Sequence, residues 1–158
     1  MRDLLGLPGA QGRTRARARA LQAGAWVLYV QETTADGVAA LEESIALARE
    51  LGDRATLARS LAILGVTFGL NTAEPERAVP SLEEALQLAW PLEDTWSIGF
   101  SLFIFGRMAL GRGDVPLAQR LCCSSALRSS RLAAPRSWFR VAGGAPRGGG
   151  CRSGSARA

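Results

Sequence analysis

Two stretches of this sequence recur after the same interval, and an internal repeat constrains the fold more than any single residue does. The segment LEESIALA, which starts at Leu41, is echoed 41 residues later by LEEALQLA, which starts at Leu82. At the same interval SLAILG, from Ser60, is echoed by SLFIFG, from Ser101. A fainter first copy lies about one period upstream, at residues 20–25. The chain is therefore predicted to contain about three similar units.

Each unit is predicted to be a pair of helices, because its apolar residues recur at spacings of three and four. The second helices carry such stripes at Leu41, Ile45, Ala48 and Leu51, and again at Leu82, Leu86, Ala89 and Leu92. Gly52-Asp53 and Gly113-Asp114 each indicate a helix end followed by the N-cap of the next helix. The expected helices cover residues 15–31, 36–51, 55–70, 75–90, 95–110 and 116–129, with a kink or a later start at Pro80. The predicted fold class is all-α.

Charge divides the chain into three parts. Residues 1–20 hold five Arg and one Asp, residues 21–114 hold six Arg and thirteen acidic residues, and residues 115–158 hold eight Arg and no acid. After Ser130 the repeat pattern stops, and the Arg, Gly and Ala that follow cannot build a core. We predict a flexible N-terminus at 1–14, a helical repeat domain at 15–130 and a disordered tail at 131–158. The tail is either genuine or the product of a frame-shifted gene end.

The repeats resemble the tetratricopeptide repeat (TPR), whose first helix carries Trp, Leu-Gly and Tyr and whose second carries Ala, Phe, Ala and Pro. The matching residues of the second copy are Leu61, Leu64-Gly65, Phe68, Ala78, Leu82, Ala85 and Pro91. The stretch from Leu41 to Asp53 is similar to the longer repeats of bacterial LuxR/MalT-type and related ATPase-coupled regulators. The resemblance implies a right-handed superhelical stack of about three antiparallel helix pairs, a TPR-like α-solenoid. Those regulators also carry a nucleotide-binding domain and a DNA-reading helix-turn-helix, and neither a Walker-type motif nor a convincing recognition helix is found here.

In that family the first helices of successive repeats line a concave surface that holds a peptide or another domain. The resemblance implies that the groove is lined by Arg19, Gln22, Trp26, Tyr29, Arg59, Val66, Phe100, Phe103 and Arg107. Aromatic rings beside Arg side chains suit an apolar peptide that carries a carboxylate. The sequence leaves open the alternative that Phe100 and Phe103 pack in the core or against a neighbouring repeat.

The composition excludes several kinds of catalysis. The chain has no His, and all 19 of its basic residues are Arg. It therefore has neither a Ser-His or Cys-His nucleophile nor a lysine for Schiff-base chemistry. The spacing of Cys122, Cys123 and Cys151 fits neither a zinc site nor a disulfide framework, and we expect Cys122 and Cys123 to pack. We expect no enzymatic activity, no cofactor and no metal site.

The sequence thus predicts a cytoplasmic protein–protein interaction scaffold, a fragment of a bacterial regulator or sensor, with a protein or peptide on its concave face. Its longest apolar runs, 61–70 and 96–105, are about half the roughly 20 residues that a membrane span needs, so no membrane partner is expected. Self-association is expected through the sixth helix, which no polar capping helix follows. The alternative is a nucleic-acid-associated transcriptional regulator acting through its basic ends, although nucleic acid is not the expected partner of an acidic body.

Overall fold

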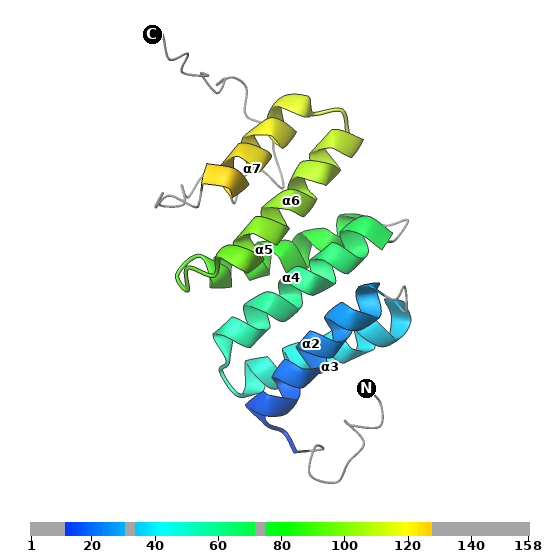
Figure 1. Cartoon of the computed structure of the whole chain (residues 1–158), viewed down its shortest axis with the longest axis vertical. Coiled ribbons are helices and arrows are strands. Elements are labelled where there is room, and N and C mark those ends of the chain that lie inside the picture. The colour runs from blue at the N-terminus through cyan, green and yellow to red at the C-terminus, as the bar shows by residue number, and fades with distance from the viewer. Residues whose placement is uncertain (1–11, 31–33, 72–74, 128–158) are drawn as a thin grey trace.

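The structure is a computed structural model, and it describes residues 12–30, 34–71 and 75–127. Within these ranges all regular elements are helical and there is no β-strand. The elements in Figure 1 are α2 (Arg15–Val30), α3 (Thr34–Glu50), α4 (Arg54–Asn71), the 3₁₀ helix η2 (Pro75–Arg77), α5 (Ala78–Ala89), α6 (Thr95–Gly111) and α7 (Val115–Leu127). The predicted all-α class is confirmed for the described part of the chain. The predicted tail at 131–158 and most of the predicted N-terminus lie outside it.

The helices begin and end close to the predicted residues, with one informative difference in the fourth. There η2 covers Pro75–Arg77 and α5 begins at Ala78, so that Pro80 lies in the first turn of α5. The N–H groups of a first turn have no acceptor within the helix, and a proline costs little at such a position. The later start predicted from Pro80 is therefore confirmed.

The turn after α3 and the turn after α6 share one construction. Gly52 and Gly113 have φ angles of +65° and +77°, in the left-handed region that glycine adopts without strain. Asp53 and Asp114 then cap the next helix, each accepting a hydrogen bond from the backbone N–H three residues further on, at 3.2 and 3.0 Å. Both helix boundaries predicted from a Gly-Asp pair are confirmed.

A third turn of this kind, which the sequence did not predict, lies between α5 and α6. Glu93 has a φ of +52° although it is not glycine, and Asp94 caps α6 by accepting a hydrogen bond from the Ser97 N–H at 3.4 Å. These two residues follow Gly52 and Asp53 by 41 positions, so the repeat extends through the turn. Leu92, which the sequence placed on the buried stripe, is 42% exposed because α5 ends at Ala89.

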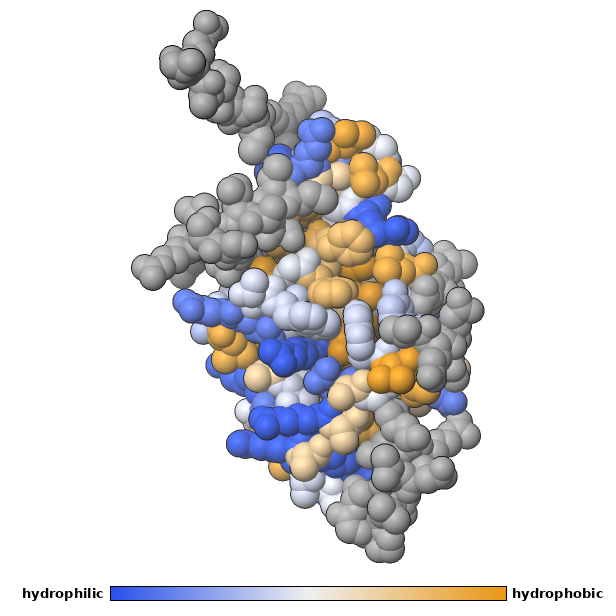
Figure 2. All heavy atoms as spheres, in the orientation of Figure 1, coloured by the Kyte–Doolittle hydropathy of each residue, from blue (hydrophilic) through white to orange (hydrophobic). Residues whose placement is uncertain are grey.

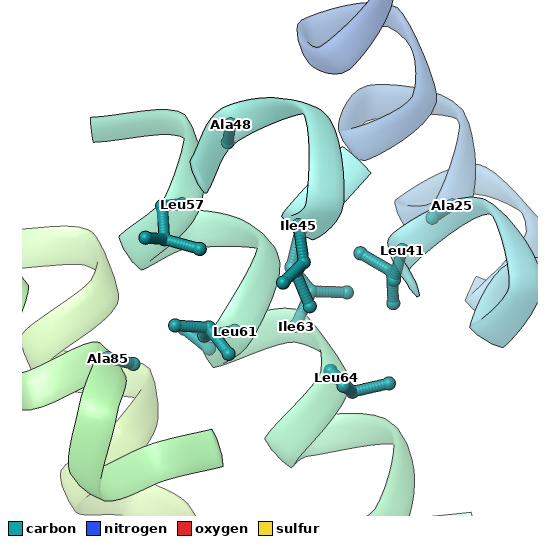
Figure 3. Close-up of a cluster of buried hydrophobic side chains, with 10 residues drawn as sticks. Ala25, Leu41, Ile45, Ala48, Leu57, Leu61, Ile63, Leu64 and Ala85 are labelled. Atoms are coloured by element: carbon teal, nitrogen blue, oxygen red, sulfur yellow. The ribbon is translucent and has the colours of Figure 1, made fainter. Parts of the chain in front are cut away.

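The helices pack in pairs, α2 with α3, α4 with α5 and α6 with α7, and α4 lies at the centre (Figure 1). It packs against α2, α3, α5 and α6, and every residue from Leu61 to Thr67 is buried. Figure 3 shows one part of the core, where Leu41 and Ile45 of α3 lie beside Leu61 and Leu64 of α4. Burial of each such side chain contributes about 1.5–3 kcal/mol relative to exposure.

Two glycines allow the neighbours of α4 to approach closely. A Cβ atom on Gly65 would lie 2.4 Å from Leu82 Cδ2 of α5, and one on Gly69 would lie 2.4 Å from Ile104 Cγ2 of α6. Real Cβ atoms do not approach other carbons so closely, because cores are packed at van der Waals distance. The absence of a side chain at these two positions therefore sets the spacing of α5 and α6 from α4.

Candidate functional site

The helices α2, α4 and α6 lie side by side on one face of the molecule, called here the first-helix face (Figure 1). All the residues predicted to line a groove belong to these three helices. Figure 2 views this face in space-filling form: hydrophilic side chains gather over the N-terminal ends of α2 and α4, and hydrophobic ones over the C-terminal half of α6. The face therefore has a charged region and an apolar region.

An aromatic cluster joins α2 to α6 across α4. Trp26 stacks on Tyr29 with ring centroids 5.5 Å apart, and it meets Trp96 and Phe100 edge to face at 5.6 and 5.4 Å. Trp96 and Phe100 stack on each other at 4.4 Å. Each pair of this kind adds about 0.5–1.5 kcal/mol beyond the burial of its area. The structure thus brings together three predicted site residues and adds Trp96, which the prediction missed although it lies seven residues before Phe103 on the same helix face.

The aromatic cluster covers the middle of the first-helix face. Trp26 packs against the part of the core that contains Ala62, while Tyr29 and Phe100 pack against the part that contains Val66. Ala62 and Val66 are 0% and 1% exposed. Val66, which the sequence predicted to line the groove, is therefore part of the buried core and not exposed on this face. Phe100 follows the packing alternative that the sequence left open.

Arg19 and Arg59 each link one first helix to the next. Arg19 Nη2 donates a hydrogen bond to Asp53 Oδ2 at 3.2 Å, and Arg59 Nε donates one to Asp94 Oδ2 at 3.1 Å. The two carboxylates are the N-caps of α4 and α6, so each binds its own helix and the preceding first helix together. The two arginine side chains remain 63% and 52% exposed, which leaves part of each guanidinium accessible to a ligand.

The pKa values of these two carboxyl groups are lower than those of ordinary aspartates. Burial by itself raises the pKa of Asp53, but hydrogen bonds from Thr56 and Arg19 outweigh it. Burial likewise raises the pKa of Asp94, and hydrogen bonds from Arg59 and from its own capped helix outweigh it. Both groups are therefore held in their charged form, as linkers and caps require.

The C-terminal half of α6 carries exposed apolar side chains on the first-helix face. Phe103 and Leu110 are 46% and 54% exposed, so Phe103 does not follow the core alternative. Arg107 lies between them, is exposed, and has no ion-pair or hydrogen-bond partner among the described residues. Gln22, the remaining predicted residue, is half-buried on α2.

A hollow of about 370 Å³ lies beside Arg107, between the end of α4, η2 and the end of α6. The residues that line it include Gly69, Met108, the two arginines Arg107 and Arg112, and Glu76. Arg112 Nη2 donates to Glu76 Oε2 at 3.1 Å, and because both side chains are more than half exposed, this ion pair is a weak one. The hollow is therefore lined by charges of both signs, with Arg112 paired to Glu76, at the edge of an apolar surface.

The basic run at the N-terminus faces partners on its own chain. Arg13 pairs with Glu50, Arg17 pairs with Glu43 at 2.6 Å, and Arg15 donates to the Leu51 carbonyl at 3.3 Å. With the link from Arg19, every arginine between residues 13 and 19 contacts α3 or the turn after it. Three of the four arginines of this run are thus paired with acids of the same chain.

The described residues contain no group of three or more Cys, Asp or Glu residues that could hold a metal ion. None of the described helices is long and apolar enough to cross a membrane. The cysteine side chains lie outside what the structure describes.

A second hollow, of about 330 Å³, lies between α3 and α5 with Arg49 and Glu84 paired at its rim, at 2.6 Å.

No protein-family model matches the chain, and no solved structure matches it. Among curated proteins, predicted HTH-type transcriptional regulators of Mycobacterium tuberculosis and Mycobacterium bovis are 34% identical to this chain over 86 residues. The matched stretch is 54% of this chain and 9% of the length of each regulator. The chain is therefore similar to a short part of proteins that are named as regulators of transcription.

Proposed function

We propose that this chain functions in transcriptional regulation. The observation that carries the proposal is its 34% identity, over 86 residues, to the mycobacterial HTH-type regulators. Because that stretch is only 9% of their length, the proposed role is that of one helical segment of such a regulator. A cytoplasmic location, beside the DNA and the transcription machinery, follows from the proposal.

In this role the helix pairs act as TPR-like repeats that form a right-handed superhelical stack. Three observations support this finer proposal: the 41-residue repeat, the packing of helices in pairs, and the recurrence of one turn and one Arg–Asp link at equivalent places. The function is binding without turnover, in keeping with a sequence that has neither His nor Lys. The sequence-based scaffold hypothesis thus becomes one part of a regulatory role.

A second candidate, direct contact with nucleic acid through the basic ends, is favoured by the names of the relatives. Phosphate binding by arginine would be independent of sequence and strongly dependent on salt. Arg13 and Arg17 are paired with acids of α3, which weakens the case at that end. The arginines of residues 131–158, which lie outside the described residues, are the ones on which this candidate depends.

Chromatin immunoprecipitation of the tagged full-length chain from its host tests the proposal. We expect enrichment of discrete promoter regions over an untagged control. Recovery of no DNA above that control, with the chain expressed at its natural level, would count against a role in transcription.

Fluorescence anisotropy with the purified chain and duplex DNA then separates the two modes of action. Tight binding at low salt that is lost when the six arginines of residues 131–158 are changed to Gln supports direct contact through the basic tail. Chromatin enrichment that survives the same six substitutions supports recruitment through another protein.

A further inference from the structure

The hollow between α3 and α5 is lined mainly by apolar side chains. Both helices pack against α4, and Leu61 and Leu64 of α4 line the hollow together with Ile45 of α3 and Pro80 of α5. Figure 3 shows Ile45 beside Leu61 and Leu64. The volume of about 330 Å³ lies at the small end of the range for binding pockets. The hollow therefore suits a few side chains of a short segment.

Three charged side chains also line this hollow, Glu42 and Arg49 of α3 and Glu84 of α5. Arg49 Nη2 lies 2.6 Å from Glu84 Oε2, so these two opposite charges are paired with each other. Glu42 is exposed and has no ion-pair or hydrogen-bond partner among the described residues. Two carboxylates and one guanidinium leave one negative charge in excess, that of Glu42. The hollow is therefore complementary to apolar groups next to a cation.

The sequence of residues 131–158, which lie outside the described residues, contains this combination. It has six Arg and no acidic residue, whereas residues 21–114 hold six Arg and thirteen acids, so the two parts of the chain attract each other. Its two aromatic residues are neighbours, Trp138 and Phe139, and they lie between Arg136 and Arg140. The segment 136–140 therefore carries two rings and two cations, as the hollow requires.

The covalent connection to α7 favours this segment over a separate molecule. Trp138 follows Leu127, the last residue of α7, by 11 positions. An extended chain of that length reaches up to about 36 Å, about three helix diameters. A tethered segment has an effective concentration on the order of millimolar, so the few contacts of a small hollow suffice to hold it. A partner in solution would have to bind through the same few contacts at a much lower concentration.

We propose that residues 136–140 dock in the hollow between α3 and α5, with an aromatic ring against its apolar residues and an arginine beside Glu42. The inference goes beyond the proposed function and does not depend on it. A docked arginine could not neutralise a DNA phosphate at the same time. Docking would therefore compete with the direct contact to nucleic acid that was considered as the second candidate function.

The test places a photoreactive aromatic residue, p-benzoylphenylalanine, at position 139 of the full-length chain. After irradiation, mass spectrometry of the digested monomer identifies the residues to which it has become attached. We expect cross-links to residues of α3 and α5 that line the hollow, such as Ala46 and Ser81. The same photoreactive residue at position 145, in place of Ala145, is the control and should show no preferred site.

Reversing charges then tests the role of Glu42. Glu42→Arg should lower the yield of the cross-link from position 139 about fivefold, because it replaces an exposed ion pair by like charges. Adding Arg136→Glu and Arg140→Glu to the same chain should restore the yield. Glu83→Arg is the matched control, because Glu83 also has no partner among the described residues but does not line the hollow. It makes the same change in net charge and should leave the yield unaltered.

Circular dichroism checks that every variant is folded. Cross-links from position 139 that spread over the surface, or that join two copies of the chain, would overturn docking within one chain. An unchanged yield in Glu42→Arg would also overturn the proposal. An equal fall in Glu83→Arg would do so too, because it would mean that net charge alone attracts the segment.

Discussion

Helices α4 and α6 occupy the same place in successive repeats, yet equivalent positions on them have opposite surroundings. Ala62 and Val66 of α4 are 0% and 1% exposed, whereas Phe103, 41 residues after Ala62, is 46% exposed, and Arg107, 41 residues after Val66, is also exposed. In the described part of the chain α4 has a first helix on each side of it and α6 has one only. The exposure of a repeat position thus depends on its neighbours as much as on the pattern within the repeat.

The sizes of the side chains match these surroundings. On α4, Ala62 belongs to the part of the core against which Trp26 of α2 packs, and Val66 belongs to the part against which Phe100 of α6 packs. The same register on α6 carries the larger side chains of Phe103 and Arg107, and both are exposed. A face that is closed over α4 is therefore open over α6.

The largest expected effect comes from exchanging the residues at equivalent positions of α4 and α6. Val66→Arg would place an unpaired charge in a site that is 1% exposed, and we expect a loss of at least about 4 kcal/mol in the free energy of unfolding, enough to unfold the chain. Arg107→Val, at the exposed position, should change it by about 0.5 kcal/mol at most. Urea unfolding followed by circular dichroism measures both. Similar losses in the two variants would mean that the two positions do not differ in burial.

Removing one ring of the aromatic cluster should have a smaller effect. Trp26→Ala deletes three ring contacts that join α2 to α6, and we expect it to cost about 2–3 kcal/mol, less than a fully buried tryptophan. Phe103→Ala, a large ring removed from the open part of the same face, is the control and should cost less than about 1 kcal/mol. If Phe103→Ala lowered the free energy of unfolding more than Trp26→Ala, the part of the face at Phe103 would be the covered one, contrary to the structure.

The smallest effect concerns the Arg59–Asp94 link, for which α7 provides a control. Asp94→Asn keeps an acceptor for the helix cap but loses the charged partner of Arg59, which should cost about 1 kcal/mol at neutral pH. Asp114→Asn, at an exposed cap without an arginine link, should cost less.

The loss of stability caused by Asp94→Asn should depend on pH. Because folding lowers the pKa of Asp94, the stability it contributes is fully present above the ordinary value of 3.8 and is lost as the pH falls through the lower folded value. The gap between wild type and Asp94→Asn, measured by urea unfolding, should therefore be constant near neutrality and close in acid. A gap that widened in acid would contradict the lowered pKa.

The helices could be predicted from the sequence because apolar periodicity and Gly-Asp pairs act within a turn or two of the chain. The turn at Glu93 and Asp94 could not, since a residue with a side chain adopts a left-handed conformation only where the surrounding structure compensates for it. Burial of Val66 could not be predicted either, because the part of the core to which it belongs includes residues of α5 and α6, far along the sequence. Trp96 was within reach of prediction, as its spacing from Phe103 places it on the same face of α6.

The Arg–Asp link also affects how such a chain can gain repeats during evolution. Each aspartate uses one carboxylate oxygen for the backbone of its own helix and the other for the arginine of the preceding repeat. Duplication of a gene segment one period long would therefore copy both partners of this link. Phe100 occupies on α6 the position that Arg59 occupies on α4, so α6 has no arginine there to form the same link. A further repeat packed against α6 would need different contacts.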